Sequence, residues 1–166
     1  DPALRQDHDR VYRSGLDEYL GAMTYSADFA FGRFNLGNLS GNLKQMEQAA
    51  EQYQAAVKID SQFYPAKVNL AMLYNRKGDN AAAERLFRET LALRDDLPEV
   101  HYSLGLLLAE EKRYTESAQY LETASQAMPH YARVHYNTGQ IWDYLNRPDK
   151  AQAALERSYA LEPQNP

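Results

Sequence analysis

The stretch PEVHYSLGLLLAEEKRYTESAQYLETASQAMPHY, residues 98–131, decides the fold. Its first part places Leu104, Gly105 and Leu108 at helical spacing, and its second part does the same with Leu121 and Ala124. The pattern therefore predicts two amphipathic helices of about 14 residues each.

The same pattern recurs with a period of 34 residues in the windows 30–63, 64–97 and 132–165, with no insertion between them. When the residues of each window are numbered from 1 to 34, small residues occupy position 8 and large apolar residues occupy position 24. Position 8 holds Gly37, Ala71, Gly105 and Gly139, position 20 holds Ala49, Ala83, Ser117 and Ala151, and position 24 holds Tyr53, Phe87, Leu121 and Leu155. A fixed period of this length indicates a repeat protein in which each repeat is one helix pair.

Turn residues separate the two helices of a repeat, as in Lys77-Gly78-Asp79-Asn80 and Asn146-Arg147-Pro148-Asp149. Small residues at positions 8, 20 and 27 allow two helix backbones to approach closely, and the large residues fill the space between them. A generic helical bundle with accidental periodicity is the alternative, and the register of the four windows disfavours it.

The combination of Leu-Gly at positions 7–8, Ala at 20, large residues at 24 and Pro at 32 resembles the tetratricopeptide-repeat (TPR) family. The resemblance covers residues 30–165 and implies an all-α fold, a right-handed superhelical α-solenoid of antiparallel helix pairs. We expect a single domain of four units (30–63, 64–97, 98–131 and 132–165). Position 4 departs from the family pattern, because it holds Arg33, Lys67, His101 and His135.

Residues 1–29 continue the phase backwards and predict an N-terminal helix of an incomplete repeat, running roughly from Asp7 to Tyr25. Because the chain starts without Met and ends just after the fourth unit, we expect it to be a fragment of a longer TPR-containing protein with an apolar end face.

The composition excludes several classes of function. The net charge is −5, without the basic patch that nucleic-acid binding requires. No apolar run is long enough to insert in a membrane directly. The absence of cysteine excludes disulfides and cysteine-ligated zinc, and leaves the compartment open between cytoplasm and periplasm.

No catalytic motif is present in the sequence, and we expect neither enzymatic activity, nor a cofactor, nor a metal. His101 and His135 share one repeat position, but equivalent positions on adjacent repeats lie about one helix spacing apart, roughly 8–10 Å, which is too far for shared ligation. A packing role for both histidines is the better interpretation.

The resemblance implies that the first helix of each pair lines a concave groove, where a protein or peptide partner binds. The expected peptide-binding residues are aromatic or apolar side chains beside short amides: Phe34, Asn35, Asn38, Asn69, Met72, Arg76, Tyr102, Tyr136, Asn137, Gln140 and Tyr144. Amides offer both donors and an acceptor to a peptide backbone, and aromatic rings supply large contact areas. Alternatively, the amides satisfy neighbouring helices and some of the aromatic rings pack between repeats.

Some TPR proteins bind the acidic C-terminus of a partner through a clamp of basic residues and amides. Asn38 and Asn69 match two amides of that clamp, but Phe34, Glu99 and Ser103 occupy its basic positions. We therefore expect a neutral or mildly polar ligand segment, with aromatic or basic residues.

Three functions remain open from the sequence. The first is an adaptor that binds a partner in the groove. The second is a self-assembling scaffold, a homo-oligomer formed through uncapped ends or through the groove. The third is an accessory interaction domain of a larger enzyme or envelope protein.

Overall fold

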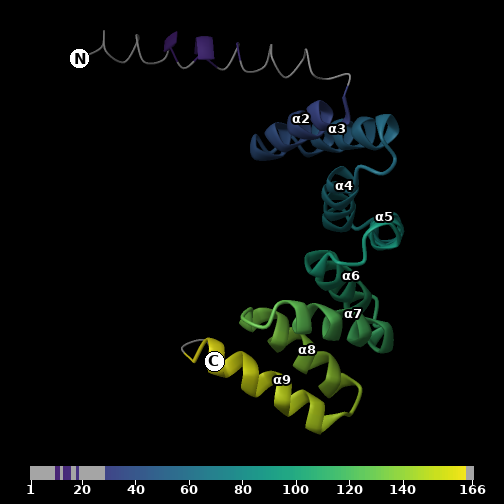
Figure 1. Ribbon diagram of the computed structural model, residues 1–166, viewed down its shortest axis with the longest axis vertical. Helices are drawn as coiled ribbons and strands as arrows, with labels where there is room; N and C mark the ends of the chain where they lie inside the picture. The colour runs from purple at the N-terminus through teal and green to yellow at the C-terminus, as the bar shows by residue number, and fades with distance from the viewer. Residues whose placement is uncertain (1–9, 12, 16–17, 19–28, 164–166) are drawn as a thin grey trace, which may run out of the picture. The chain divides into compact units, whose positions relative to one another are not determined.

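The computed structural model describes residues 10–11, 13–15, 18 and 29–163, and in this part of the chain every regular element is an α-helix, with no strand. The helices are α2 (Ala30–Asn42), α3 (Met46–Ile59), α4 (Tyr64–Arg76), α5 (Asn80–Leu93), α6 (Pro98–Glu110), α7 (Tyr114–Ala127), α8 (Ala132–Tyr144) and α9 (Pro148–Leu161). Helices of 13 and 14 residues alternate along the chain, so the predicted pattern of paired helices is confirmed (Figure 1).

Each window of 34 residues contains two of these helices. The division into four repeats within a single domain stays a prediction, because the described residues divide into two compact units, one up to residue 70 and one from residue 71. The boundary between these units, the N-terminal unit and the C-terminal unit, falls inside α4. The helix predicted from Asp7 to Tyr25 lies mostly outside the described residues.

The turn between the two helices of each pair uses one residue in the left-handed region. This residue is Lys44, Gly78, Lys112 or Asn146, with φ of 61°, 83°, 61° and 54°. Glycine and asparagine tolerate this conformation, whereas a lysine adopts it only at a cost. The four turns therefore share one geometry, although only the turns that contain Gly78 and Asn146 have a residue type that predicts it.

In the N-terminal unit, α2 packs against α3 around small and aromatic side chains. Ala49, Tyr53 and Ala56 of α3 are buried, with exposed fractions of 5% or less. Gly37 of α2 lies over the ring of Tyr53, and a Cβ atom at this position would lie 2.5 Å from Tyr53 Cε1. The glycine is therefore required by the close approach of the ring.

In the C-terminal unit, the core follows the α6–α7 and α8–α9 pairs. Leu104, Leu108 and Leu121 are fully buried, and Leu121 packs with Ala118 and Ile141. Gly105 allows the Leu121 side chain to pack directly on the α6 backbone, because a Cβ at Gly105 would lie 2.7 Å from Leu121 Cγ. This contact holds α6 close to α7 and so positions the groove face of α6.

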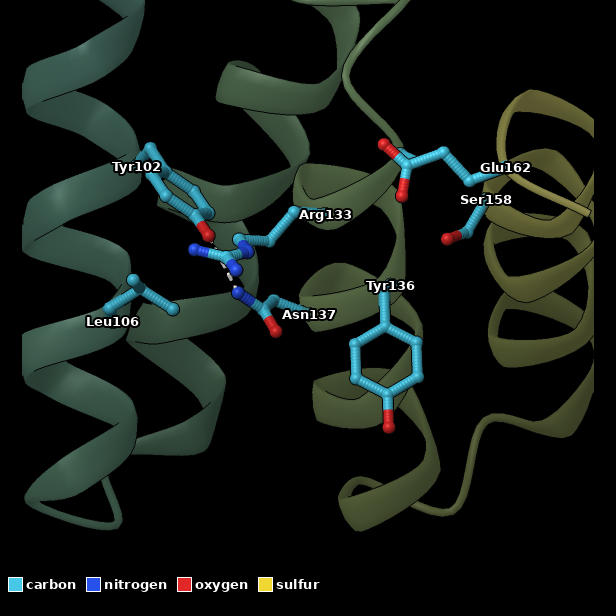
Figure 2. A pocket seen from close by; sticks show the side chains of 8 residues that line it. Tyr102, Leu106, Arg133, Tyr136, Asn137, Ser158 and Glu162 are labelled. Atoms are coloured by element: carbon cyan, nitrogen blue, oxygen red, sulfur yellow. Dashed lines mark hydrogen bonds between the residues drawn. The ribbon is translucent and has the colours of Figure 1, made fainter. Parts of the chain in front are cut away.

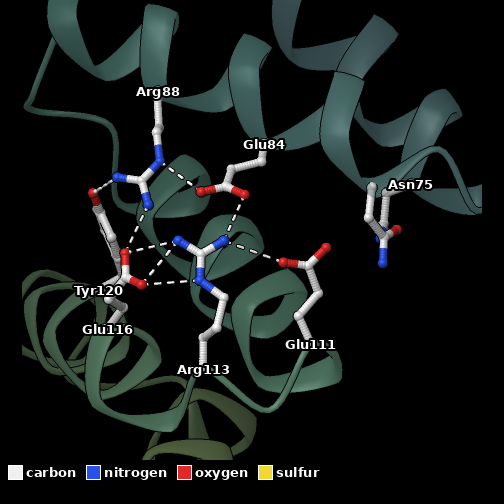
Figure 3. A network of polar contacts seen from close by, with 8 residues as sticks. Asn75, Glu84, Arg88, Glu111, Arg113, Glu116 and Tyr120 are labelled. Carbon is white, nitrogen blue, oxygen red and sulfur yellow. Dashed lines mark hydrogen bonds and ion pairs between the residues drawn. The ribbon is translucent and has the colours of Figure 1, made fainter.

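A network of ion pairs joins α5 to α7 on the surface of the C-terminal unit (Figure 3). Arg113 donates to Glu84 at 2.7 Å and to Glu116 at 2.9 Å, while Arg88 donates to the same two carboxylates at 2.7 and 2.9 Å. Arg88 also donates to the hydroxyl of Tyr120 at 3.0 Å. The hydrogen bond from Arg113 is the main cause that lowers the pKa of Glu84, and Arg88 adds to it.

Candidate binding groove

A groove of about 700 Å³ lies in the C-terminal unit between α6, α8 and the C-terminal part of α9 (Figure 2). Tyr102 and Leu106 come from α6, while Ala132, Arg133, Tyr136 and Asn137 come from α8; Ser158 and Glu162 close the side formed by α9. The structure therefore brings together three of the predicted site residues, Tyr102, Tyr136 and Asn137.

Both groove tyrosines accept a hydrogen bond from an amide of α8. Asn137 Nδ2 donates to Tyr102 Oη at 2.7 Å, and Gln140 Nε2 donates to Tyr136 Oη at 2.9 Å. A phenol oxygen that accepts from an amide keeps its own proton available for another acceptor. The two hydroxyls are thus oriented as donors, and Gln140 contributes to the site by holding Tyr136.

The environment of Tyr102 keeps its hydroxyl protonated. Burial raises the pKa of Tyr102, against smaller opposing effects from the Asn137 hydrogen bond and the Arg133 charge. Arg133 is exposed, and Figure 2 shows its guanidinium beside Tyr102 and Asn137. Glu162 lies on the α9 side of the groove, so the groove carries one cation and one anion.

The N-terminal unit contains a second cluster of predicted residues, Asn38, Tyr53 and Asn69. Tyr53 Oη donates to Asn38 Oδ1 at 2.8 Å, and Asn69 Nδ2 donates to Asn38 Oδ1 at 2.9 Å and to Tyr53 Oη at 3.2 Å. Burial raises the pKa of Tyr53. The cluster ties α2 and α3 to the first part of α4, so Asn38 and Asn69 satisfy neighbouring helices with these atoms.

The remaining predicted residues lie in other surroundings. Phe34 packs against Tyr53 and edge-on against Phe63, with ring centroids 5.9 and 5.5 Å apart, and Asn35 is half-buried on α2. Met72 and Arg76 are exposed on α4. Tyr144 stacks on Tyr114 at 4.8 Å with nearly parallel rings. None of these five lines the groove of the C-terminal unit.

Sequence reasoning missed the α9 side of the groove. The sequence gives no signal for Ser158 and Glu162, because the TPR resemblance places the binding surface on the first helix of each pair. Ser158 lies in the last turn of α9 and Glu162 directly follows this helix, and both line the same cavity as Tyr136. Leu106 and Arg133 also line the cavity, and both lie on the first helix of a pair, the helix that the resemblance predicts to face the groove.

The two histidines at repeat position 4 hold the loops before their helices. His101 Nε2 lies 2.8 Å from the carbonyl of Asp95, and His135 Nε2 lies 3.2 Å from the carbonyl of Pro129. Among the described residues, no group of three histidine or acidic side chains is placed to bind a metal ion. No helix in this part of the chain combines the length and apolar character needed to cross a bilayer.

Comparison with family models assigns the helix pairs to a known class. Models of the tetratricopeptide repeat match residues 32–63, 68–129 and 108–166. The chain belongs to the TPR family, and its fold is an all-α TPR solenoid. Repeats of this class are protein-interaction modules, so the chain is by class an interaction scaffold or adaptor that binds protein partners.

Individual proteins of known name are also similar to this chain. Over 140 residues the chain is 31% identical to the type IV pilus assembly protein PilF of Pseudomonas aeruginosa, a match that covers 82% of this chain and 54% of the relative. The chain therefore spans about half the length of this relative. The solved structure of Pseudomonas aeruginosa PilF superposes with a TM-score of 0.71 at 27% identity, covering 87% of this chain and 64% of that one.

MamA from Desulfovibrio magneticus gives a TM-score of 0.77 at 16% identity and covers 98% of this chain and 95% of that chain. At this identity the similarity shows the fold alone.

Proposed function

We propose that this chain is a non-catalytic adaptor that binds a segment of a partner protein in the groove between α6, α8 and α9. The observation that carries the proposal is the cavity of about 700 Å³ lined by two tyrosines, an arginine and an amide. Tyrosine and arginine are enriched among the residues that dominate binding energy at protein interfaces. The cavity volume lies within the range of typical ligand sites.

The predicted peptide contacts in the N-terminal unit form a second element of the proposal. Phe31 is 62% exposed beside Phe34 on α2. Exposed aromatic side chains are suited to contact with a partner. Asn35 lies half-buried on the same helix.

A peptide selected from a random phage-displayed library against the whole chain provides the probe. We expect Tyr136→Ala to lower the affinity for this peptide about tenfold, which corresponds to ~1.4 kcal/mol. Tyr136 is 46% exposed, so the change removes groove surface without opening a cavity in the core.

Tyr159→Ala is the matched control, because Tyr159 is 63% exposed on α9 and does not line the groove. Isothermal titration calorimetry gives the affinities, and circular dichroism verifies that both variants keep the helical fold. Equal affinities of the wild type and Tyr136→Ala, or a selection that enriches no binder, contradict the proposal.

A second candidate function is self-assembly through the outer face of α9. Leu155 is 37% exposed, whereas Leu121 at the same repeat position is fully buried, and Tyr159 lies one turn further along α9. Light scattering over a range of concentrations tests this function. A chain that remains monomeric at all concentrations rules out this candidate.

The comparison with PilF suggests a setting for the adaptor. Because PilF is named as a type IV pilus assembly protein, we propose that the partner of this chain belongs to an assembly machinery of the cell envelope. Deletion of the encoding gene tests this setting. Loss of surface pili supports it, and unchanged pili contradict it.

A further inference from the structure

The groove between α6, α8 and α9 carries opposite charges on its two sides. Figure 2 shows the Arg133 guanidinium on the α6 side, beside Tyr102 and Asn137, and the Glu162 carboxylate on the α9 side. Both charged side chains are exposed. The α9 side of the cavity therefore presents a negative charge that a ligand in the groove can reach.

Glu162 stands at a position that is electrostatically unfavourable for its own helix. It is the C-cap residue of α9, its backbone N–H donates to the carbonyl of Ser158 at 3.0 Å, and the last turn of α9 contains no basic side chain. Because the terminal carbonyl groups give a helix C-terminus a partial negative charge, a carboxylate is unfavourable there and a cation is favourable. The charge of Glu162 therefore does not serve the stability of α9.

Arg133 shows the same conflict at the start of α8. It lies in the first turn of that helix, where the helix dipole is positive, and this turn contains no acidic side chain. Each of the two groove charges thus adds to the dipole of its helix instead of offsetting it. Local rules of helix stability are typically broken in this way at functional sites. Since Arg133 repels a cation on the α6 side, the favourable place for a positive charge in the groove is beside Glu162.

Tyr136 and Ser158 complete the surroundings of Glu162. The ring of Tyr136 is 46% exposed, and Gln140 Nε2 holds it by donating to Tyr136 Oη at 2.9 Å. An aromatic ring attracts a cation at its face, and the methylene groups of a lysine or arginine pack well on apolar surface. The hydroxyl of Ser158, on the last turn of α9, adds a further acceptor on the same side of the cavity.

We propose that the α9 side of the groove binds a lysine or arginine side chain of the partner segment, with the Glu162 carboxylate as its counter-ion and the Tyr136 ring as its contact surface. This inference rests on the proposed function and adds the chemistry of one ligand side chain to it. An acidic side chain at this place meets the Glu162 carboxylate and the negative end of α9. The site therefore selects for a positive charge by attraction and against a negative charge by repulsion.

The test begins with Glu162→Gln, which removes the charge and keeps the shape of the side chain. We expect the phage-selected peptide to contain a lysine or arginine, and we expect Glu162→Gln to lower its affinity about fivefold, measured by isothermal titration calorimetry. Glu156→Gln is the matched control, because Glu156 is exposed on α9, accepts a hydrogen bond from Gln152 and does not line the groove. This control removes the same charge and is expected to leave the affinity unchanged.

A double-mutant cycle between protein and peptide identifies the pair. Each basic residue of the peptide is replaced in turn by norleucine, and we expect one replacement to lower the affinity for the wild type about fivefold but to have little effect on Glu162→Gln. The affinity lost in Glu162→Lys is expected to return when the same peptide residue is glutamate. Because the cycle reports only the coupling of the two groups, it remains decisive if a variant also changes the stability of α9.

The outcomes separate this inference from the proposed function. Selected peptides without a basic residue, or losses that are fully additive in the cycle, overturn the inference. If Tyr136→Ala loses affinity while Glu162→Gln keeps it, the groove binds the peptide through other contacts and only this inference fails. If Tyr136→Ala keeps full affinity, the groove is not the binding site and both proposals fail.

Discussion

Replacing Gly105 with alanine tests the close contact between α6 and α7 that supports the groove. Gly105 lies within α6, where alanine favours the helix by about 1 kcal/mol over glycine. The added Cβ, however, would lie 2.7 Å from Leu121 Cγ and 3.3 Å from the Leu121 backbone nitrogen. Carbon atoms pack best at roughly 3.5–4.0 Å, so α7 has to move.

Overpacking of a filled core costs about 1–3 kcal/mol. Because Leu121 is fully buried, it has no free space into which to retreat, and we expect Gly105→Ala to lower the free energy of unfolding by up to ~2 kcal/mol after the helix preference is included. Urea unfolding followed by helical circular dichroism measures the change.

A double-mutant cycle isolates the contact. Leu121→Ala alone leaves a cavity and costs about 2–5 kcal/mol. In this background Gly105→Ala no longer meets the leucine, so we expect it to become stabilising by ~1 kcal/mol.

Gly41→Ala is the matched control, because the nearest atom to its Cβ, Tyr53 Oη, is 4.0 Å away. If Gly105→Ala stabilises the wild type as much as Gly41→Ala does, the two helix backbones are further apart than described and the reasoning is refuted.

Two further predictions concern the turns and the surface network. We expect Lys112→Gly to raise the free energy of unfolding by roughly 0.5–1 kcal/mol, because φ of 61° is costly for lysine; urea unfolding measures it, and a loss of stability contradicts the turn geometry. Arg113 and Arg88 lower the pKa of Glu84 below the ordinary 4.5. The stabilisation from Glu84 is therefore fully present above that value and is lost as the pH falls through the lower folded-state pKa. Glu84→Gln is expected to flatten the stability profile below about pH 5, and an unchanged slope means that the network contributes nothing.

The helix pairs were predictable because the repeat pattern appears four times in one register. Gly37 and Gly105 were correctly read as points of close approach, and both are met by a large side chain from the next helix. The backbone preference of lysine does not predict the left-handed turns at Lys44 and Lys112, because the turn is imposed by the packing of the helices on both sides. The network between Glu84 and Arg113 connects residues 29 positions apart and follows only from the assembled fold.

The groove was predictable only in part. Tyr102, Tyr136 and Asn137 meet in one cavity because repeat positions 5 and 6 share a helix face. The sequence left open whether the amide nitrogens face a ligand or a neighbouring helix. In the structure the amide nitrogens of Asn69 and Asn137 point toward tyrosine hydroxyls. This orientation depends on atomic positions that the sequence does not give. Glu162 was missed because the contribution of α9 to the cavity depends on how α9 packs beside α8.

The central claim is that a partner segment occupies the groove between α6, α8 and α9. Amide chemical-shift mapping by NMR, with the phage-selected peptide added to the whole chain, tests it most directly. We expect the largest changes at the amides of Tyr102, Arg133 and Asn137, and we expect the amides of Ala81 and Arg85 on the exposed face of α5 to stay unchanged. The largest changes on α5, or on the outer face of α9 around Tyr159, contradict it.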